Sequence, residues 1–199
     1  IEQNYIKPYP ICRWAHAALD ALSRLMGAHG FHADDVANIT VNTFAESAAL
    51  FPGMPATTSQ AQYSLPFALA TMLVHGRIGP DEITGAGLSD PQVAALLPWI
   101  SVHEAVRHSE RFPEGRWSDV TVELKDGRRL ASGAVNARGG PEAPMDMHEV
   151  EAKFHIMAAA LSRARRQAIW EMRGQLMQPE AKFEELARLV RVPMEETHD

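Results

Sequence analysis

One lysine near the start of the printed sequence stands in a stiff stretch of backbone. Lys7 precedes Pro8, and Pro10 follows in the run "KPYP". Proline fixes its own φ angle and biases the residue before it away from helical geometry. An ammonium group on such a restrained backbone can bind a carboxylate, or stabilise negative charge that develops on one. The alternative interpretation is a solvated lysine in a linker, because most lysines are exposed.

A second group of reactive side chains follows at helical spacing. Cys12, His16 and Asp20 lie four residues apart and would share one stripe of a helix. A cysteine with a histidine and an acid invites comparison with nucleophilic catalysis. However, three side chains stacked along one helix do not converge on one reacting atom. A buried thiol and a histidine with a structural hydrogen bond explain the stripe more simply, and His16 alone stays a candidate acid or base.

Other chemical motifs are absent from the sequence. The remaining histidines are scattered, and none forms a His-x-x-x-His pair with carboxylates nearby, so a metal site is unsupported. Neither a P-loop nor a G-x-G-x-x-G or G-x-S-x-G motif occurs. The run "RGGPEAP" is rich in glycine, but it has no nucleotide-binding context and is interpreted as an interdomain loop.

Composition restricts the class of function. The chain has 199 residues, of which 46% are hydrophobic, and its formal net charge is −6. No basic face is available for nucleic acid, and the apolar runs are shorter than the roughly 20 residues that span a bilayer. A single cysteine excludes an internal disulfide, and no signal-peptide pattern opens the sequence. We therefore expect a cytoplasmic protein that binds neither nucleic acid nor membrane.

The elements that must position these side chains are predicted from periodicity. Apolar residues at spacings of three and four predict a helix over 14–28 and a mostly apolar helix over 58–75. Alternation predicts strands over 36–45, in "WISVHEAV" and in "WSDVTVELKDGRRLASGAV", where "KDGR" is a hairpin turn. Asp90 and Pro91 are typical of a helix start. A three-stranded antiparallel group with one further strand follows from these patterns.

The clearest boundary is "NARGGPEAPMD", where glycines and prolines interrupt all periodicity. After it we predict helices over 146–162, 163–177 and 179–190, the first with a capping box of Asp146 and Glu149. The chain is therefore predicted to be an α+β unit of antiparallel strands packed with helices, followed by an all-helical tail.

Five stretches in this order resemble the MmgE/PrpD family. "KPYPICRWAHAALDAL" is similar to the lysine segment that opens the second domain of the family. "ANITVNTFAESAAL", "AQYSLPFALATMLVHGRIG" and "DVTVELKDGRRL" resemble its next strand, its small-residue helix and its hairpin. "RGGPEAPMDMHEVEAKF" resembles its glycine–proline loop and returning helix. Family members include 2-methylcitrate dehydratases, cis-aconitate decarboxylases and iminodisuccinate epimerases.

The resemblance implies a two-domain architecture. Residues 1–143 would be the α+β lid domain, and 144–199 would be C-terminal helices that complete a helical domain. The first part of that helical domain is absent here. We expect it to be a separate chain, to have been cleaved, or not to be included. The family also implies a homodimer formed through the helical domain.

The resemblance also implies chemistry. Family enzymes use no cofactor and no metal, and act on small di- or tricarboxylates by removing a proton next to a carboxylate. Lys7 and His16 are the expected catalytic residues, and Lys7, Arg13 and Cys12 are the expected substrate-binding residues. The family's other acid–base groups would lie in the missing helical part.

Departures from the family pattern leave the reaction open. The tyrosine of the decarboxylases is missing from the loop after the first strand, and "PICRW" replaces the Pro-x-Glu-Phe-His run of methylcitrate dehydratases. A dehydratase-type lyase or an epimerase is therefore expected ahead of a decarboxylase. The alternative is a non-catalytic lid or assembly subunit that needs a partner helical-domain chain.

Overall fold

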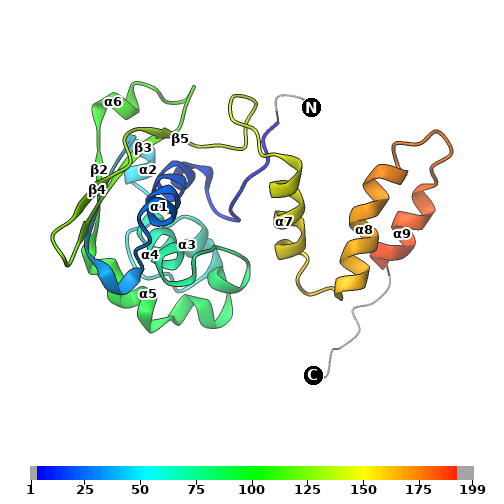
Figure 1. The fold of residues 1–199 in the computed structure, drawn as a ribbon, viewed down its shortest axis with the longest axis horizontal. Coiled ribbons are helices and arrows are strands. Elements are labelled where there is room, and N and C mark those ends of the chain that lie inside the picture. Colours follow the sequence, from blue (N-terminus) through cyan, green and yellow to red (C-terminus); the bar gives the residue numbers. More distant parts are fainter. Residues whose placement is uncertain (1–3, 192–199) are drawn as a thin grey trace. The chain divides into compact units, whose positions relative to one another are not determined.

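We describe the protein from a computed structural model, which describes residues 4–191. The chain forms two compact units, Ile1–Met145 and Asp146–Asp199, and each is described by itself. The first unit is a sheet covered by helices, so the predicted α+β class is confirmed (Figure 1). The assignment of these units to a lid domain and a helical domain stays a prediction.

A mixed sheet forms the frame of the first unit. Its strands are β1 (Val36–Thr43), β2 (Ile100–Glu104), β3 (Trp117–Leu124), β4 (Arg129–Ala131) and β5 (Val135–Asn136). They are ordered β2-β1-β3-β4, and β5 pairs with the start of β3. The central pair is antiparallel, with Ile39 opposite Val122 and Val41 opposite Val120. All four of these side chains are buried, so the alternation read from the sequence marks the face that packs on the helices.

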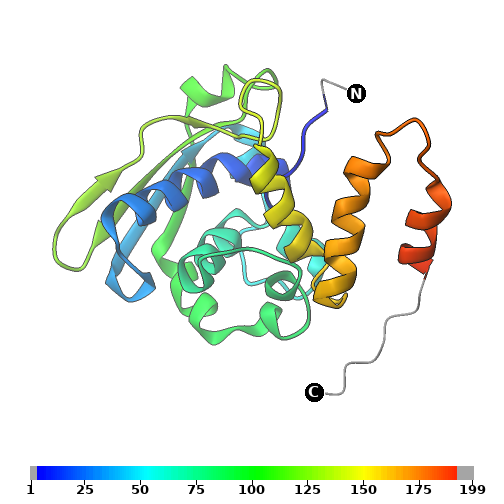
Figure 2. The same ribbon diagram turned by 45° about the vertical axis from the view of Figure 1, so that its right-hand side comes forward.

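The helices of the first unit pack against that face. Figures 1 and 2 show α1 (His16–His29) running along the sheet with α4 (Leu65–His75) beside it. The first turn before α1 is a 3₁₀ helix at Arg13–Ala15, and Gly30 ends α1 with φ of 64°. Shorter helices complete the unit. They are α2 (Ala45–Ala48), α3 (Thr58–Gln62), α5 (Pro91–Leu96) and α6 (Val106–Ser109), with 3₁₀ turns at Ala33–Asp35, Asp81–Ile83, Gly85–Ser89 and Leu97–Trp99.

Two expectations about these elements need correction. The helix predicted over 58–75 is divided, because Ser64 accepts a hydrogen bond from the Phe67 amide and caps a new helix there. The sheet is mixed rather than wholly antiparallel, because β2 pairs with β1 in parallel, with Val41 opposite Val102. The hairpin at Lys125–Arg128 and the cap at Asp90 are confirmed.

In the second unit the described residues, up to 191, form three helices, α7 (Met147–Met157), α8 (Arg163–Gln175) and α9 (Phe183–Arg191). The predicted capping box of Asp146 and Glu149 starts α7. The ring centroids of Phe154 and Trp170 lie 5.4 Å apart, and Arg165 donates to the carbonyl of Leu189 over 2.8 Å. Several large apolar side chains of this unit remain exposed, and Met177 is 83% exposed. Over residues 4–191, no helix has the length and apolar character needed to cross a membrane.

A polar cluster closes the carboxyl end of β1. Asp119 accepts hydrogen bonds from Asn42 at 3.0 Å, from buried His108 at 2.8 Å and from Arg107 at 2.5 Å. Burial alone would raise the pKa of the Asp119 carboxyl, but the hydrogen bonds from Asn42, His108 and Arg107 outweigh it and lower the pKa. Asp119 therefore joins β1, β3 and α6 through one carboxylate.

Packing of the central strand predicts a large effect of a small truncation. Val41→Ala removes two buried methyl groups and should lower the free energy of unfolding by about 2 kcal/mol. Val106→Ala is the matched control, because Val106 is 67% exposed and the same change there should cost less than about 0.5 kcal/mol. Urea denaturation of both variants measures the difference. Equal losses would contradict the packing described for β1.

The Asp119 cluster predicts a pH dependence of stability. The pKa of the Asp119 carboxyl is lower in the folded state than in the unfolded state. The contribution of Asp119 to the free energy of unfolding is therefore fully present above the unfolded pKa, and it is lost as pH falls through the folded pKa. The difference in free energy of unfolding between the wild type and Asp119→Asn should therefore shrink on acidification below about pH 4. Urea denaturation at several pH values measures it. Val41→Ala serves as control, because it removes no titratable group, and a constant Asp119→Asn difference would refute the linkage.

Candidate functional site

The segment that carries Lys7 lies along the glycine–proline loop. The amide of Ile6 donates to the carbonyl of Gly139 over 2.9 Å, and the amide of Gly139 donates to Ala143 over 2.7 Å. Gly139 has φ of 93°, and a Cβ atom there would lie 2.2 Å from the carbonyl oxygen of Ile6. Only glycine permits this approach. The residue next to Lys7 is therefore paired to a fixed loop.

A buried carboxylate joins the same two segments. Asp20, which is 3% exposed, accepts from the Tyr9 hydroxyl over 2.8 Å. Arg138, at the start of the loop, donates to Asp20 from its amide at 3.4 Å and from Nε at 3.2 Å. Burial and the negative charge of Asp20 raise the pKa of Tyr9, so the phenol stays a neutral donor. Tyr9, Asp20 and Arg138 form what we call the Asp20 network.

Further hydrogen bonds fix the other side of the proline bracket. The amide of Cys12 donates to the carbonyl of Gln62 over 2.8 Å, and the side-chain amide of Gln62 reaches the carbonyl of Pro10 at 3.4 Å. Lys7 itself is exposed. Within the described residues its ammonium has no hydrogen bond or ion pair. Lys7 thus presents its ammonium group to solvent from a backbone segment that is held in place by hydrogen bonds.

Arg13 lies under the same loop. Its guanidinium stacks on the ring of Tyr5 at 3.8 Å from the centroid, and a Cβ atom on Gly140 would lie 3.0 Å from its Nη2. Burial and then the charge of Arg116 lower the pKa of Arg13, and Tyr5 and Glu142 offset this in part. Its Nε is buried and has no hydrogen-bond partner among residues 4–191. Arg13 therefore retains capacity to bind an anion.

Arg116 extends this cationic surface from the turn before β3. Its Nη1 donates to the carbonyl of Pro113 over 2.8 Å, and its guanidinium lies 5.5 Å from the ring centroid of Phe112. Its Nε, like that of Arg13, is buried without a partner in the described part of the chain. Two guanidinium groups that repel each other favour an anion between or above them. We call Lys7, Arg13 and Arg116 the cationic surface.

The predicted site residues fall into two groups. The loop brings Lys7 and Arg13 to one region, and Cys12 is a free, half-buried thiol packed against the core. His16 is completely buried, with Nε2 3.3 Å from the carbonyl oxygen of Ile11 and its ring against that of Tyr9 at 5.2 Å. The structure therefore does not place His16 on a surface with Lys7, and its catalytic role stays a prediction.

The sequence interpretation missed Arg116 and Arg138, and it undervalued Asp20. Asp20 was visible as an acid on an apolar helix face, which is a signal of a buried ion pair. Arg138 opens the run "RGGP", but nothing local indicates its partner 118 residues away. In the part of the chain that the structure describes, no group of three or more His, Cys, Asp or Glu side chains could hold a metal ion. The chemistry that the arrangement supports is carboxylate binding.

The Asp20 network predicts a specific loss when its hydroxyl is removed. Tyr9→Phe leaves a buried carboxylate with one donor fewer, so the free energy of unfolding should fall by about 1.5–3 kcal/mol. The amides of the Lys7 segment should also exchange faster with deuterium. Tyr63→Phe is the matched control, because Tyr63 is 53% exposed. Unchanged exchange around Lys7 in Tyr9→Phe would show that the network does not hold the segment.

Comparison with known proteins places the chain. A profile of the MmgE/PrpD C-terminal domain matches residues 9–177. A mitochondrial 2-methylcitrate dehydratase of Yarrowia lipolytica is 28% identical over 113 residues. That alignment spans 54% of this chain and 22% of the relative, so the aligned part corresponds to about a fifth of that enzyme's length. Since the profile covers well over half of the residues, the chain belongs to the MmgE/PrpD family and contains its C-terminal domain.

Proposed function

We propose that the chain supplies the carboxylate-binding wall of a dehydratase-type enzyme acting on a small di- or tricarboxylate. The observation that carries this proposal is the exposed ammonium of Lys7, which has no partner within residues 4–191 on a segment fixed to Gly139 and Asp20. The family match and the dehydratase relative support the reaction class.

The cationic surface suits the charge changes of such a reaction. Removing a proton next to a carboxylate moves negative charge onto that carboxylate, and a fixed ammonium stabilises this charge more than it stabilises the ground state. Lys7 would take this role. Arg13, with Arg116 behind it, would hold a second carboxylate through charge-assisted hydrogen bonds. Such a division selects substrates with at least two carboxylates.

The proton itself must go to a group other than Lys7. His16 is the predicted acid or base, but it is completely buried and contacts the ring of Tyr9. It can reach a substrate only if the Lys7 segment moves. We therefore assign His16 a structural role, in which its ring supports that of Tyr9. The acid–base step is assigned to the helical part of the family's enzymes. Dehydration, epimerisation and decarboxylation share this step, and the relative favours dehydration.

A second candidate function is that of a non-catalytic lid or assembly subunit. The observation that favours it is the complete burial of His16, the predicted acid or base, which is therefore not exposed beside Lys7. Exposed Met177 and Phe183 in the helical unit support a partner chain or a homodimer for either candidate. A cytoplasmic location remains part of the proposal.

Removal of the Lys7 charge tests the proposal. Co-expressed with the helical domain of a family enzyme, Lys7→Met should lower kcat/KM for the preferred hydroxy- or unsaturated polycarboxylate by about 100-fold or more, because one charge-stabilising group is lost. Arg24→Met is the matched control, since Arg24 is an exposed cation on α1 of the same unit and its loss should leave kcat/KM unchanged.

The same experiment separates the two functions. If the wild-type pair is active and Lys7→Met is equally active, the role of Lys7 is wrong. If the wild-type pair forms a complex but turns over none of the polycarboxylates, the lid or assembly function replaces the enzymatic one. Circular dichroism checks that each variant folds.

A further inference from the structure

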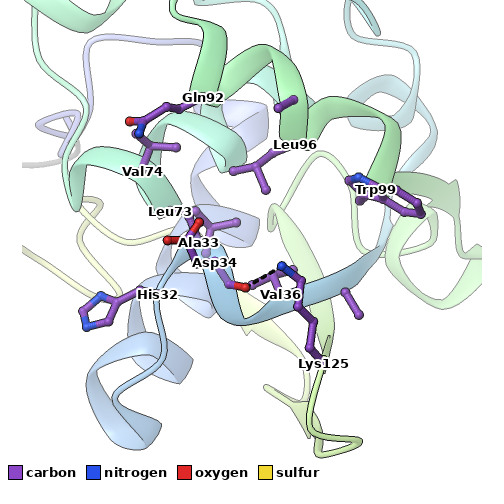
Figure 3. Close-up of a pocket in the computed structure, with 12 residues that line it drawn as sticks. His32, Ala33, Asp34, Val36, Leu73, Val74, Gln92, Leu96, Trp99 and Lys125 are labelled. Atoms are coloured by element: carbon purple, nitrogen blue, oxygen red, sulfur yellow. Dashed lines mark hydrogen bonds between the residues drawn. The ribbon is translucent and has the colours of Figure 1, made fainter.

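A cavity of about 730 Å³ lies at the opposite end of α1 from the Lys7 segment. Figure 3 shows its walls, which come from the turn before β1, the end of α4, helix α5 with the 3₁₀ turn after it, and the turn after β3. The 14 residues of α1 span about 21 Å. A ligand in this cavity therefore lies far from the cationic surface.

The cavity has the size and lining of a small-molecule site. Pockets of roughly 300–1,000 Å³ with apolar walls and a few polar groups are typical of ligand sites. Leu73, Val74 and Leu96 form apolar walls, and the indole of Trp99 stands at the rim with 56% of its surface exposed. A large exposed indole beside an apolar hollow offers a flat surface for a ring or a branched chain.

Lys125 supplies one positive charge to this cavity. Its Nζ donates to the main-chain carbonyl of Asp34 over 2.6 Å (Figure 3). Its amide donates to the carbonyl of Asp35 over 2.8 Å. Among residues 4–191, Lys125 forms no ion pair with a carboxylate. The carboxylate of Asp35 is already used, because it accepts from the amide of His32. No carboxylate of the described residues therefore neutralises this ammonium group, and two of its N–H groups can still donate to a ligand.

The charge around the cavity limits what it can hold. Asp34 also lines the cavity, so its carboxylate opposes a second negative charge on a ligand. Gln92 adds a side-chain amide to the opposite wall, as Figure 3 shows. The ammonium of Lys125, the opposing carboxylate of Asp34, the imidazole of His32 and an apolar floor favour a ligand with a single negative charge and an apolar body.

We propose that this cavity, which we call the Lys125 cavity, binds a small monocarboxylate with a flat or branched apolar body. The carboxylate pairs with the ammonium of Lys125, and the body lies between Leu96 and Trp99. This site is separate from the proposed polycarboxylate site in position and in charge, and it stands whether or not that function is correct.

Calorimetric titration of the full chain tests the site with three probes. Naphthalene-2-carboxylate should bind saturably at one site with a Kd below ~1 mM. Its neutral analogue naphthalene-2-methanol should bind about tenfold more weakly, because it cannot pair with Lys125. Succinate, which has two charges and no ring, should not bind in the Lys125 cavity.

Two variants locate the probe. Lys125→Gln should weaken naphthalene-2-carboxylate about tenfold and leave the neutral analogue unchanged, whereas Lys182→Gln should change neither. Ala95→Phe should abolish binding of both aromatic probes, because Ala95 lines the cavity from the exposed side of α5, where a larger side chain fills it without entering the core.

The results that overturn the proposal are equally specific. The site is refuted if no probe binds saturably to the wild type. It is also refuted if Ala95→Phe retains wild-type affinity, since the probe must then lie elsewhere, for example on the exposed apolar residues of the helical unit. Equal weakening of the charged and neutral probes by Lys125→Gln refutes the carboxylate pairing. If Lys125→Gln fails to fold, Ala95→Phe and the pair of probes decide.

Discussion

The buried carboxylate of Asp20 is the constraint on which the arrangement at Lys7 depends. An ionised group that is 3% exposed must be paired, because its lost hydration is otherwise uncompensated. Its donors come from Tyr9 in the proline bracket and from Arg138 at the start of the glycine–proline loop. When Tyr9 and Arg138 both bind Asp20, Gly139 lies against Ile6, and the backbone at the neighbouring Lys7 is held in place. The position of the candidate site is thus set by a charge that never touches a substrate.

Most helices and strands of the described residues could be predicted from the sequence because their patterns are local. The apolar spacing of α1, the alternation in β1 and the caps at Asp90 and Asp146 each depend on near neighbours in the chain. Two features could not be predicted in this way. The parallel pairing of β2 depends on how the chain crosses over between strands, and strand alternation carries no direction. The break before α4 depends on the Ser64 cap, which a continuous apolar run conceals.

The residues of the candidate site also divide into those with a local sequence signal and those without one. Lys7 and Arg13 could be found because a proline bracket and a following helix are visible in one short run. Arg116 and Arg138 could not, because their contacts connect residues more than a hundred positions apart along the chain. The stripe of His16 and Asp20 was real, but its meaning depended on Tyr9, which covers both side chains through its ring and its hydroxyl. Spacing therefore identifies which side chains share a face, and burial decides whether that face does chemistry.

The two anion sites proposed for this unit differ in charge rather than in fold. Three cations, those of the cationic surface, lie at one end of α1, and the carboxylate of Glu142 offsets part of their charge. This charge suits a ligand with two or more negative charges. At the other end Lys125 is opposed by Asp34, which suits one charge. Between the sites lie Leu19 and Leu22 of α1, both completely buried in a close-packed core. A ligand at either end would stabilise the folded unit by mass action, and we expect the two contributions to add because the two sites share no residue.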